Sequence, residues 1–431
     1  MPQLASTSGK QALDDLLQSS VDSREVPAVF FGVTNAEGTL YSNCAGEKRF
    51  GDESQGQVDE DTTLQLFSST KLLTTIACLQ LLDRGLVTLD DPDLIETHLP
   101  ELASLRVLKG YKDTSTDDGD GKGGGEPIWE EPKTKITLRM LLSHTSGMGY
   151  TFNSPDLDRW TKETSHPSFL GPKASIDSYA LPLVFEPKTQ WHYSVGIDWA
   201  GHLVHRLTHL SLEEYFKEHI FKPCGMESTS FYPTEEIRRE AMAVTYLDPT
   251  EGKIKSYPDN YGSLHYARPE RPEEVGELAG GAGLFGTAKD YLAFLRGVLA
   301  CDPSRQSTSD DNGTSKLISG ESFRELFNDS IPRTVPKTGL LSMMQRQTYH
   351  DPTYTLEEVG HSVGLCLNFR DSKYGRKAGS GCWDGAAKTQ YWLDPVSGIA
   401  GVCFTNIFAQ NPNPFMDLYT KFERTVYDHL E

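Results

Sequence analysis

The sequence predicts an α+β fold, in which an antiparallel sheet flanked by helices is joined to an inserted, mainly helical lobe. The β-rich runs lie near the two ends of the chain, at residues 28–44 and 360–408. Helical patterns dominate between them, and segregation of this kind is typical of α+β proteins. We therefore expect an α/β domain of residues 1–100 and 280–431 around a central antiparallel sheet, and an inserted helical domain with lid loops at 101–279. Sequential packing of separate domains is the alternative.

The first hundred residues predict a helix, a hairpin and a buried helix. Residues 11–21 have amphipathic helical spacing. Two runs rich in β-branched and aromatic residues, 28–34 and 39–44, flank a short turn that contains glycine, which predicts a hairpin. The helix expected from near Ser68 to about Leu82 is apolar on nearly every side, so it belongs at the centre of a domain.

The middle of the chain alternates helices with irregular segments. Residues 111–132 are acidic and rich in glycine, which predicts a solvated loop or a flap over a site. Residues 136–142 resume helical spacing. Residues 148–183 mix aromatics with prolines, which suits either a lid and substrate wall or packing against the core. Two further helices are expected at 198–209 and 211–221.

The last part of the chain returns to β-structure. Polar loops are expected at 249–274 and 302–316. Between them, the Gly-rich residues 280–287 precede a helix at 288–299. They lack the Gly-Lys-Ser/Thr ending of a phosphate-binding loop, so we interpret them as close backbone packing near a site. A last amphipathic helix is expected at 414–430. The β-rich runs of this part are residues 360–369, 389–395 and 398–408.

Composition excludes several classes of partner. The chain carries 61 acidic residues against 41 Lys and Arg, a net charge of −20, so nucleic acid and anionic membranes are poor partners. The N-terminus lacks the basic and apolar regions of a signal peptide, and no stretch is apolar enough to span a membrane. These features predict a soluble, cytoplasmic protein.

The spacing of cysteines and histidines predicts no metal site. The cysteines are 7 in number and scattered without a Cys-x-x-Cys pair, which indicates reduced thiols rather than disulfides or a zinc site. His205 and His209 have metal-ligand spacing. They lack the Glu of a His-Glu-x-x-His motif, so we expect solvated surface side chains.

The stretch Ser68-Ser69-Thr70-Lys71 combines a hydroxyl and an amine at a helix start. Residues three apart share a helical face, so Lys71 would stand one turn above Ser68. A helix N-terminus favours an oxyanion, and burial disfavours the ammonium form of lysine, which could then act as a base. The alternative is a serine near the N-cap with an unrelated lysine one turn later.

The stretch around Ser68 is the first of three motifs that follow one another along the chain. The ordered series is Phe67-Ser68-Ser69-Thr70-Lys71, Trp191-His192-Tyr193-Ser194 and Cys382-Trp383-Asp384-Gly385-Ala386. It resembles the three motifs of serine β-lactamase-like enzymes of the class C and penicillin-binding type. Leu141-Leu142-Ser143-His144-Thr145-Ser146-Gly147 and the Gly-rich residues 281–288 are similar to two further segments of that superfamily. From about residue 10 onward, the chain is most similar to the esterase and fungal transesterase (lovastatin acyltransferase-like) branch.

The resemblance implies a β-lactamase/transpeptidase-like α/β sandwich with its active site between the two domains. It implies that Ser68 is the nucleophile, with Lys71 and Tyr193 as coupled base and proton shuttle. The backbone amides of Ser68 and Ala386 would form the oxyanion hole. No Gly-x-Ser-x-Gly elbow occurs in the chain, which excludes the α/β-hydrolase alternative.

Two departures from the penicillin-recognising pattern bear on the substrate. Val195 stands where those enzymes have the Asn of Tyr-x-Asn, and Trp383-Asp384-Gly385 stands where they have Lys-Thr-Gly. The cation that would pair with a lactam carboxylate is therefore missing, which favours an ester or thioester. The candidate substrate-binding residues are Tyr150, Trp160, Trp383 and Asp384. For Trp383, inward packing is the alternative.

Together these features predict a serine acyltransferase or esterase that works without a cofactor. Its acyl-enzyme at Ser68 would pass the acyl group from a small-molecule ester or thioester, or from a donor bound to a carrier protein, to an alcohol or to water. A β-lactamase or amide hydrolase is one alternative. A non-catalytic binding protein that retains the fold is another.

Overall fold

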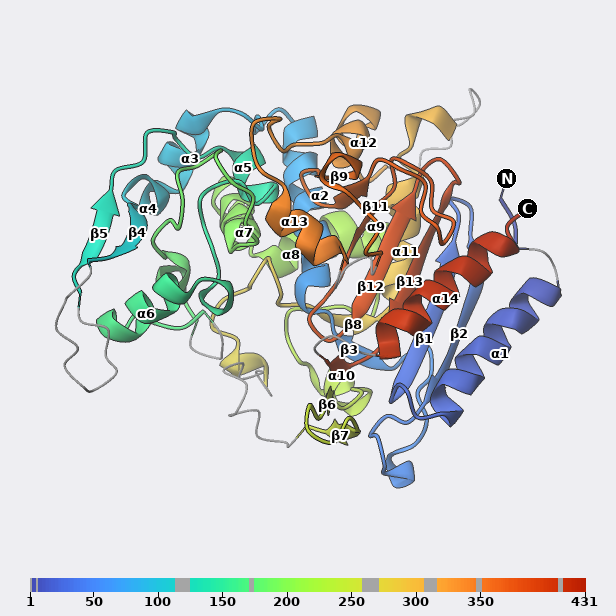
Figure 1. Ribbon diagram of the computed structural model, residues 1–431. Coiled ribbons are helices and arrows are strands. Elements are labelled where there is room, and N and C mark those ends of the chain that lie inside the picture. The colour runs from blue at the N-terminus through green and yellow to red at the C-terminus, as the bar shows by residue number, and fades with distance from the viewer. Residues whose placement is uncertain are drawn as a thin grey trace.

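The computed structural model describes residues 2–4, 7–112, 125–169, 174–257, 271–305, 316–345, 351–409 and 414–431. Its largest element is a seven-stranded antiparallel sheet in the order β2-β1-β13-β12-β11-β10-β9 (Figure 1). Its strands are β1 (Ala28–Thr34), β2 (Thr39–Gly46), β9 (Val359–His361), β10 (Cys366–Asn368), β11 (Gly381–Trp383), β12 (Thr389–Asp394) and β13 (Ile399–Phe404). Because β1 pairs with both β2 and β13, the two ends of the chain share one sheet. The predicted α+β fold is confirmed.

Smaller sheets surround this one. β3 (Thr63–Gln65) pairs with β8 (Phe285–Thr287), and β4 (Val107–Tyr111) pairs with β5 (Pro127–Glu130). The remaining group joins β14 (Ile407–Phe408), β6 (Thr245–Leu247) and β7 (Ile254–Ser256).

The helices cover the sheet and build the rest of the described chain. They are α1 (Ser8–Asp22), α2 (Thr70–Asp83), α3 (Pro92–His98), α4 (Pro100–Ala103), α5 (Leu138–Leu142), α6 (Pro155–Thr164), α7 (Gly196–Thr208), α8 (Leu212–Phe216), α9 (Lys222–Cys224), α10 (Glu235–Arg239), α11 (Ala288–Leu299), α12 (Gly320–Phe327), α13 (Thr338–Met343) and α14 (Pro414–Asp428). In Figure 1, α3 to α6 lie on the far side of α2 from the sheet.

The central strand β1 is buried on both faces. Phe31 stacks on Phe422 of α14, with ring centroids 4.1 Å apart. The next residue, Gly32, faces Leu292 of α11 closely enough that an added Cβ would lie 3.0 Å from that side chain. Since successive strand residues point to opposite faces, α14 and α11 cover the two sides of the sheet. Figure 1 shows α1 beside α14 on the same side.

The helix α2 occupies the centre of the molecule, as its apolar sequence predicts. It is buried along nearly its whole length and packs against α7 and α8. A helix that is apolar all round needs such partners on every side, because no face of it is suited to water. This packing places the start of α2, and therefore Ser68, between the sheet and the other helices.

Several predicted strands are divided in the structure. The run 360–369 is a hairpin of β9 and β10, because the Ser362 hydroxyl accepts hydrogen bonds from the amides of Gly364 and Leu365 and turns the chain. The run 398–408 breaks after β13, and β14 leaves the main sheet to pair in parallel with β6.

Some segments predicted to be irregular contain regular elements. Within 111–132, Trp129 of β5 pairs with Leu108 of β4, whereas 113–124 lies outside the described residues. The aromatic segment 148–183 contains α6, and the loop 249–274 contains β7. The helix predicted at 211–221 continues after α8 as a π-helix, Lys217–Phe221. The division into domains at residues 100 and 280 stays a prediction.

Candidate active site

Ser68 lies in a short 3₁₀ turn, Phe67–Ser69, between β3 and α2. Phe67 has a φ of 47°, a left-handed conformation that costs a residue with a side chain about 1–3 kcal/mol. Its buried ring packs edge-on against Phe408, with centroids 5.4 Å apart, and so anchors the turn. The structure thus fixes the Ser68 side chain at the start of α2, where it is partly exposed.

Lys71 stands one turn further along, with its amine turned toward Ser68. Its Nζ lies 3.4 Å from Ser68 Oγ and donates to the Tyr150 hydroxyl at 3.2 Å and to the Gly281 carbonyl at 2.7 Å. The side chain is only 1% exposed. Burial lowers the pKa of Lys71 to about 8, against the opposing influence of the Asp198 and Asp384 carboxylates.

Tyr193 reaches Ser68 from the segment that precedes α7. Its hydroxyl lies 2.6 Å from Ser68 Oγ, and its ring lies 4.8 Å from Lys71 Nζ. Burial raises the pKa of Tyr193 well above its ordinary value, although the hydrogen bond with Ser68 acts in the opposite direction. The side-chain amide of Asn153 donates to the Tyr193 carbonyl at 2.9 Å and holds this segment in place. The structure therefore brings Ser68, Lys71 and Tyr193 together from distant parts of the chain.

Tyr150, predicted to contact substrate, is 6% exposed and has its hydroxyl at Lys71. The same hydroxyl donates to Asp198 Oδ2 at 3.3 Å, and Asp198 Oδ1 accepts from the Gly281 amide at 2.8 Å. Asp198 is not among the sequence-predicted site residues. The available signal was a carboxylate inside the otherwise apolar start of a buried helix, where an acidic group needs partners.

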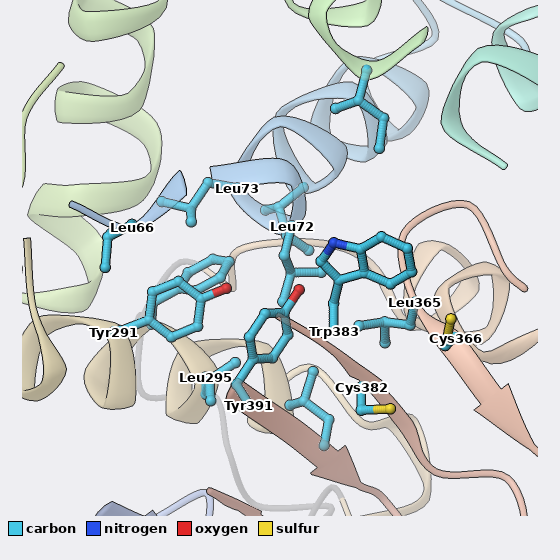
Figure 2. Packing of buried hydrophobic residues seen from close by; sticks show 14 of the residues in the cluster. Leu66, Leu72, Leu73, Tyr291, Leu295, Leu365, Cys366, Cys382, Trp383 and Tyr391 are labelled. Atoms are coloured by element: carbon cyan, nitrogen blue, oxygen red, sulfur yellow. The ribbon is translucent and has the colours of Figure 1, made fainter. Parts of the chain in front are cut away.

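Trp383 is the last residue of β11 and is 2% exposed. Its ring lies 5.4 Å from that of Tyr193 and 6.0 Å from that of His144. Figure 2 shows the indole between β11 and α2, beside Leu72. Trp383 thus packs inward and adjoins Tyr193, and its contact with substrate stays a prediction.

The turn after β11 is held tightly against the segment that carries Ser68. The Ser69 hydroxyl donates to the Thr389 carbonyl at 2.9 Å, and the Thr389 hydroxyl donates to the Leu66 carbonyl at 3.0 Å. An added Cβ on Gly385 would collide with that carbonyl oxygen and with the Thr389 hydroxyl. Glycine at this position therefore permits the close approach, and it places the exposed Ala386 on the turn that adjoins Ser68.

The other two predicted substrate-binding residues are Asp384, which directly follows Trp383, and Trp160, which lies on α6. Asp384 is partly exposed and accepts a hydrogen bond from Gln390 at 3.4 Å. Burial of its carboxylate raises the pKa of Asp384 to about 6, whereas Lys388 acts to lower it. Trp160 lies on α6 with its ring 5.0 Å from that of His166, and within the described residues it has no ring contact with Tyr193.

A pocket of about 660 Å³ opens within the predicted lid segment. Phe152, Phe169 and residues of α6 line it, whereas Ser68 does not. Phe152 is 66% exposed and stacks on Tyr150, with ring centroids 4.8 Å apart. The pocket therefore adjoins the group that contacts Lys71, and the role of this segment as a lid or substrate wall stays a prediction.

Other predictions concern groups away from this cluster. His205 lies exposed on α7 and His209 caps that helix. No group of three or more His, Cys, Asp or Glu side chains suited to a metal ion occurs within the described residues. The seven cysteines are free thiols, as expected. Over the same described ranges, no helix combines the length and the apolar character that crossing a membrane requires.

Comparison with known proteins identifies the family of this chain. The beta-lactamase family model matches residues 13–424, almost the whole chain. The chain belongs to the beta-lactamase family. This result confirms the sequence-based resemblance.

Within this family, the chain is similar to named esterases and acyltransferases. The lovastatin esterase of Penicillium rubens is 28% identical over 96% of this chain and 98% of its own. The monacolin J acid methylbutanoyltransferase of Aspergillus terreus is 28% identical over 96% of this chain and 95% of its own. A mutant of the simvastatin synthase LovD from Aspergillus terreus superposes with a TM-score of 0.80 at 27% identity, covering 98% of this chain and 95% of that one. The chain is thus a serine hydrolase or acyltransferase of the beta-lactamase family.

Proposed function

We propose that this enzyme forms an acyl-enzyme at Ser68 and passes the acyl group from an ester or thioester to an alcohol or to water. One observation carries the proposal. The Ser68 hydroxyl lies within 2.6 Å of the Tyr193 hydroxyl and 3.4 Å of a buried Lys71 amine whose pKa is lowered to about 8. A serine hydroxyl needs such a partner, because it is too weak an acid to attack a carbonyl unaided.

Lys71 and Tyr193 are suited to different proton transfers during acylation of Ser68. In its neutral form Lys71 accepts the Ser68 proton as the Ser68 Oγ–C bond forms. The oxygen that becomes negative would be stabilised by the amides of Ser68 and Ala386, which the locked Gly385 turn holds in adjoining segments. Tyr193, with its raised pKa, keeps its proton at neutral pH and can give it to the departing alkoxide or thiolate. It then regains a proton from the Lys71 ammonium.

The second half-reaction reverses these transfers. The hydroxyl of the acceptor, or water, gives its proton to Lys71 through Tyr193 and attacks the acyl carbon. The Ser68 Oγ–C bond breaks and Ser68 recovers a proton, which restores the free enzyme. Hydrolysis and transfer therefore use the same residues and differ only in the acceptor.

The substrate class rests on the relatives and on the lining of the site. One relative is named for its action on the ester lovastatin and another for transfer of a methylbutanoyl group to monacolin J acid. We infer a small-molecule ester or thioester donor, free or bound to a carrier protein, and an alcohol acceptor. Trp383, packed against Tyr193, and the adjoining Asp384 would contact the substrate. The predicted cytoplasmic location stays a prediction.

Intact-mass spectrometry tests the proposal. Incubation with p-nitrophenyl esters, acyl thioesters and a fluorophosphonate is expected to add one adduct, which peptide mapping assigns to Ser68. Ser68→Ala is the control and should remain unlabelled. If the wild-type protein stays unmodified, or if the adduct lies elsewhere, the proposal is wrong. Chasing the acyl-enzyme with water against alcohols then measures the balance between hydrolysis and transfer.

A further inference from the structure

Asp198 is a buried carboxylate that contacts neither Ser68 nor the open side of the site. It lies in the first turn of α7, with 4% of its surface exposed. Its two oxygens have different partners. Oδ1 accepts from the Gly281 amide at 2.8 Å, and Oδ2 accepts from the Tyr150 hydroxyl at 3.3 Å. The second distance is long for a hydrogen bond between two oxygens.

Both partners of Asp198 are also acceptors for Lys71. The Lys71 amine donates to the Gly281 carbonyl at 2.7 Å and to the Tyr150 hydroxyl at 3.2 Å, with Ser68 Oγ as its third neighbour at 3.4 Å. An ammonium group has three N–H donors, so all three contacts are satisfied when Lys71 is charged. A neutral amine has two N–H donors and one lone pair, and the direction of that lone pair decides whether it can act as a base.

We propose that Asp198 is a positioning residue that turns the lone pair of neutral Lys71 toward Ser68. The inference rests on the proposed function, because it assigns Lys71 as the base for Ser68. Asp198 draws the Tyr150 proton away from Lys71, which leaves the Tyr150 oxygen free to accept from the amine. Asp198 also holds Gly281 in place by accepting a hydrogen bond from its backbone N–H, and this fixes the Gly281 carbonyl that accepts from Lys71. The two N–H groups of neutral Lys71 are then bound to Tyr150 and Gly281, and the lone pair faces Ser68.

Asparagine at position 198 would reverse this arrangement. The amide oxygen would accept from the Gly281 amide, which leaves the NH₂ group facing Tyr150. An NH₂ group donates a hydrogen bond, so the Tyr150 proton would turn toward Lys71 and occupy its lone pair. The substitution conserves size and shape. It reverses the direction of the hydrogen bond with Tyr150 and removes one negative charge.

The glycine-rich residues 280–287 allow Asp198 to approach the backbone that binds Lys71. An added Cβ on Gly281 would lie 2.5 Å and 2.8 Å from the two carboxylate oxygens of Asp198. Only glycine allows residue 281 to donate its backbone N–H to Asp198 while its carbonyl, in the next peptide group, accepts from Lys71. Sequence reasoning interpreted residues 280–287 as close backbone packing near a site, and the contact with Asp198 identifies what they pack against.

The charge of Asp198 also affects the proton affinity of Lys71. The titratable groups that face Lys71 from the packed elements are Asp198 on α7, Asp384 after β11, Tyr150, Tyr193 and His144. The two carboxylates raise the pKa of Lys71, and burial lowers it. His144 is held neutral, since burial lowers its pKa well below the ordinary value. Removing the Asp198 charge should therefore lower the pKa of Lys71 further.

Pre-steady-state acylation tests the inference. An excess of enzyme is mixed with p-nitrophenyl butyrate in a stopped-flow instrument, and p-nitrophenol release is followed at its isosbestic wavelength from about pH 6 to about pH 10, the range that brackets the Lys71 pKa. For the wild type we expect the rate to rise to a plateau with a midpoint near the Lys71 pKa of about 8. Asp198→Asn should lower the plateau about tenfold or more and move the midpoint down by about one unit.

Asp290→Asn is the matched control. Asp290 is a buried helical carboxylate that accepts from the Ser228 amide and the Thr229 hydroxyl, outside the site. Its variant should keep both midpoint and plateau. Tyr150→Phe is the second test variant. It removes one link between Asp198 and Lys71, so its plateau should fall and its midpoint should move down by less than in Asp198→Asn.

The outcomes separate the two proposals. An unchanged midpoint in Asp198→Asn with a reduced plateau would indicate a merely structural role and overturn the inference. A shifted midpoint with an unchanged plateau would leave only a charge effect and also overturn it. If Asp198→Asn does not fold, as judged by circular dichroism, Tyr150→Phe decides, and wild-type behaviour of that variant overturns the inference. A wild type without a Ser68 adduct contradicts the proposed function instead.

Discussion

Lys71 and Tyr193 both lie next to the Ser68 hydroxyl, and burial moves their pKa values in opposite directions. It lowers that of Lys71 to about 8 and raises that of Tyr193 well above its ordinary value. Both shifts favour the neutral form, because a buried charge loses its hydration. A neutral amine is a base, whereas a neutral phenol is an acid. The same desolvation therefore supports the complementary parts in proton transfer that we propose for the two residues.

Tyr193→Phe tests this division at the residue scale. Loss of the hydroxyl removes the proton donor for the leaving group, so acylation should slow by about 10²–10⁴-fold, measured by p-nitrophenol release. The slowing should be smaller for p-nitrophenyl esters than for alkyl esters, whose leaving groups need the proton more. Tyr41→Phe is the matched control, since Tyr41 is a buried tyrosine whose hydroxyl bonds Asp14 outside the site. Equal rates for Tyr193→Phe and wild type would contradict the assignment.

At the scale of elements, the turn between β11 and β12 is joined to the start of α2 by side-chain and backbone contacts. Thr389 bonds both Ser69 and Leu66, and Gly385 lies against the Leu66 carbonyl. Two segments that are far apart in the chain thus share one rigid junction. The geometry of the proposed oxyanion hole depends on this junction rather than on either segment alone.

Gly385→Ala should therefore reduce both stability and activity. The added methyl group meets backbone, which cannot move aside, so the expected loss is about 1–3 kcal/mol in the free energy of unfolding. Urea unfolding measures the first effect, and the rate of Ser68 labelling by a fluorophosphonate measures the second. Gly38→Ala is the control. Its Cβ would meet nothing within 4 Å, so its stability should change by less than about 0.5 kcal/mol. A stable, fully active Gly385→Ala protein would show that the junction tolerates displacement.

The elements predicted correctly are those whose signal is local. The hairpin of β1 and β2 and the buried α2 follow from the patterns of their own residues. The division of 360–369 depends on the Ser362 hydroxyl, and β5 depends on pairing with β4. These are contacts between residues that the local pattern does not relate. The motif series predicted that Ser68, Lys71 and Tyr193 would meet. Asp198 was missed because its partners Tyr150 and Gly281 are identified only when the chain is folded.

At the scale of the whole molecule, one sheet is built from both ends of the chain. β1 contributes its Phe31 to the face covered by α14, while α11 covers the other face. Stability of this layer is distinct from the chemistry proposed at Ser68. Phe31 and Phe422 pack on the side covered by α14, and within the described residues their rings do not contact those of Tyr193 or Trp383.

Phe422→Ala should separate the two properties. The side chain is fully buried, and its removal leaves a cavity beneath α14, so the free energy of unfolding should fall by about 3–5 kcal/mol. The fraction that remains folded should still label at Ser68 at the wild-type rate. Urea unfolding measures the loss of stability, and the rate of Ser68 labelling by a fluorophosphonate measures the second quantity in the same preparation. A changed labelling rate in the folded fraction would show that the sheet layer and the site are coupled.

The pairing of β1 with β13 has a consequence for synthesis of the protein. β1 is synthesised long before the Gly385 turn and its partner β13, because most of the described chain lies between them. At typical translation rates β1 waits roughly 20–70 s for that partner. During this time the edge of β1 that later pairs with β13 has no native partner, and such an edge can pair with another chain. A chain that ends before Gly385 carries Ser68 and Lys71 without the turn that adjoins them, so the proposed oxyanion hole needs both segments to be synthesised.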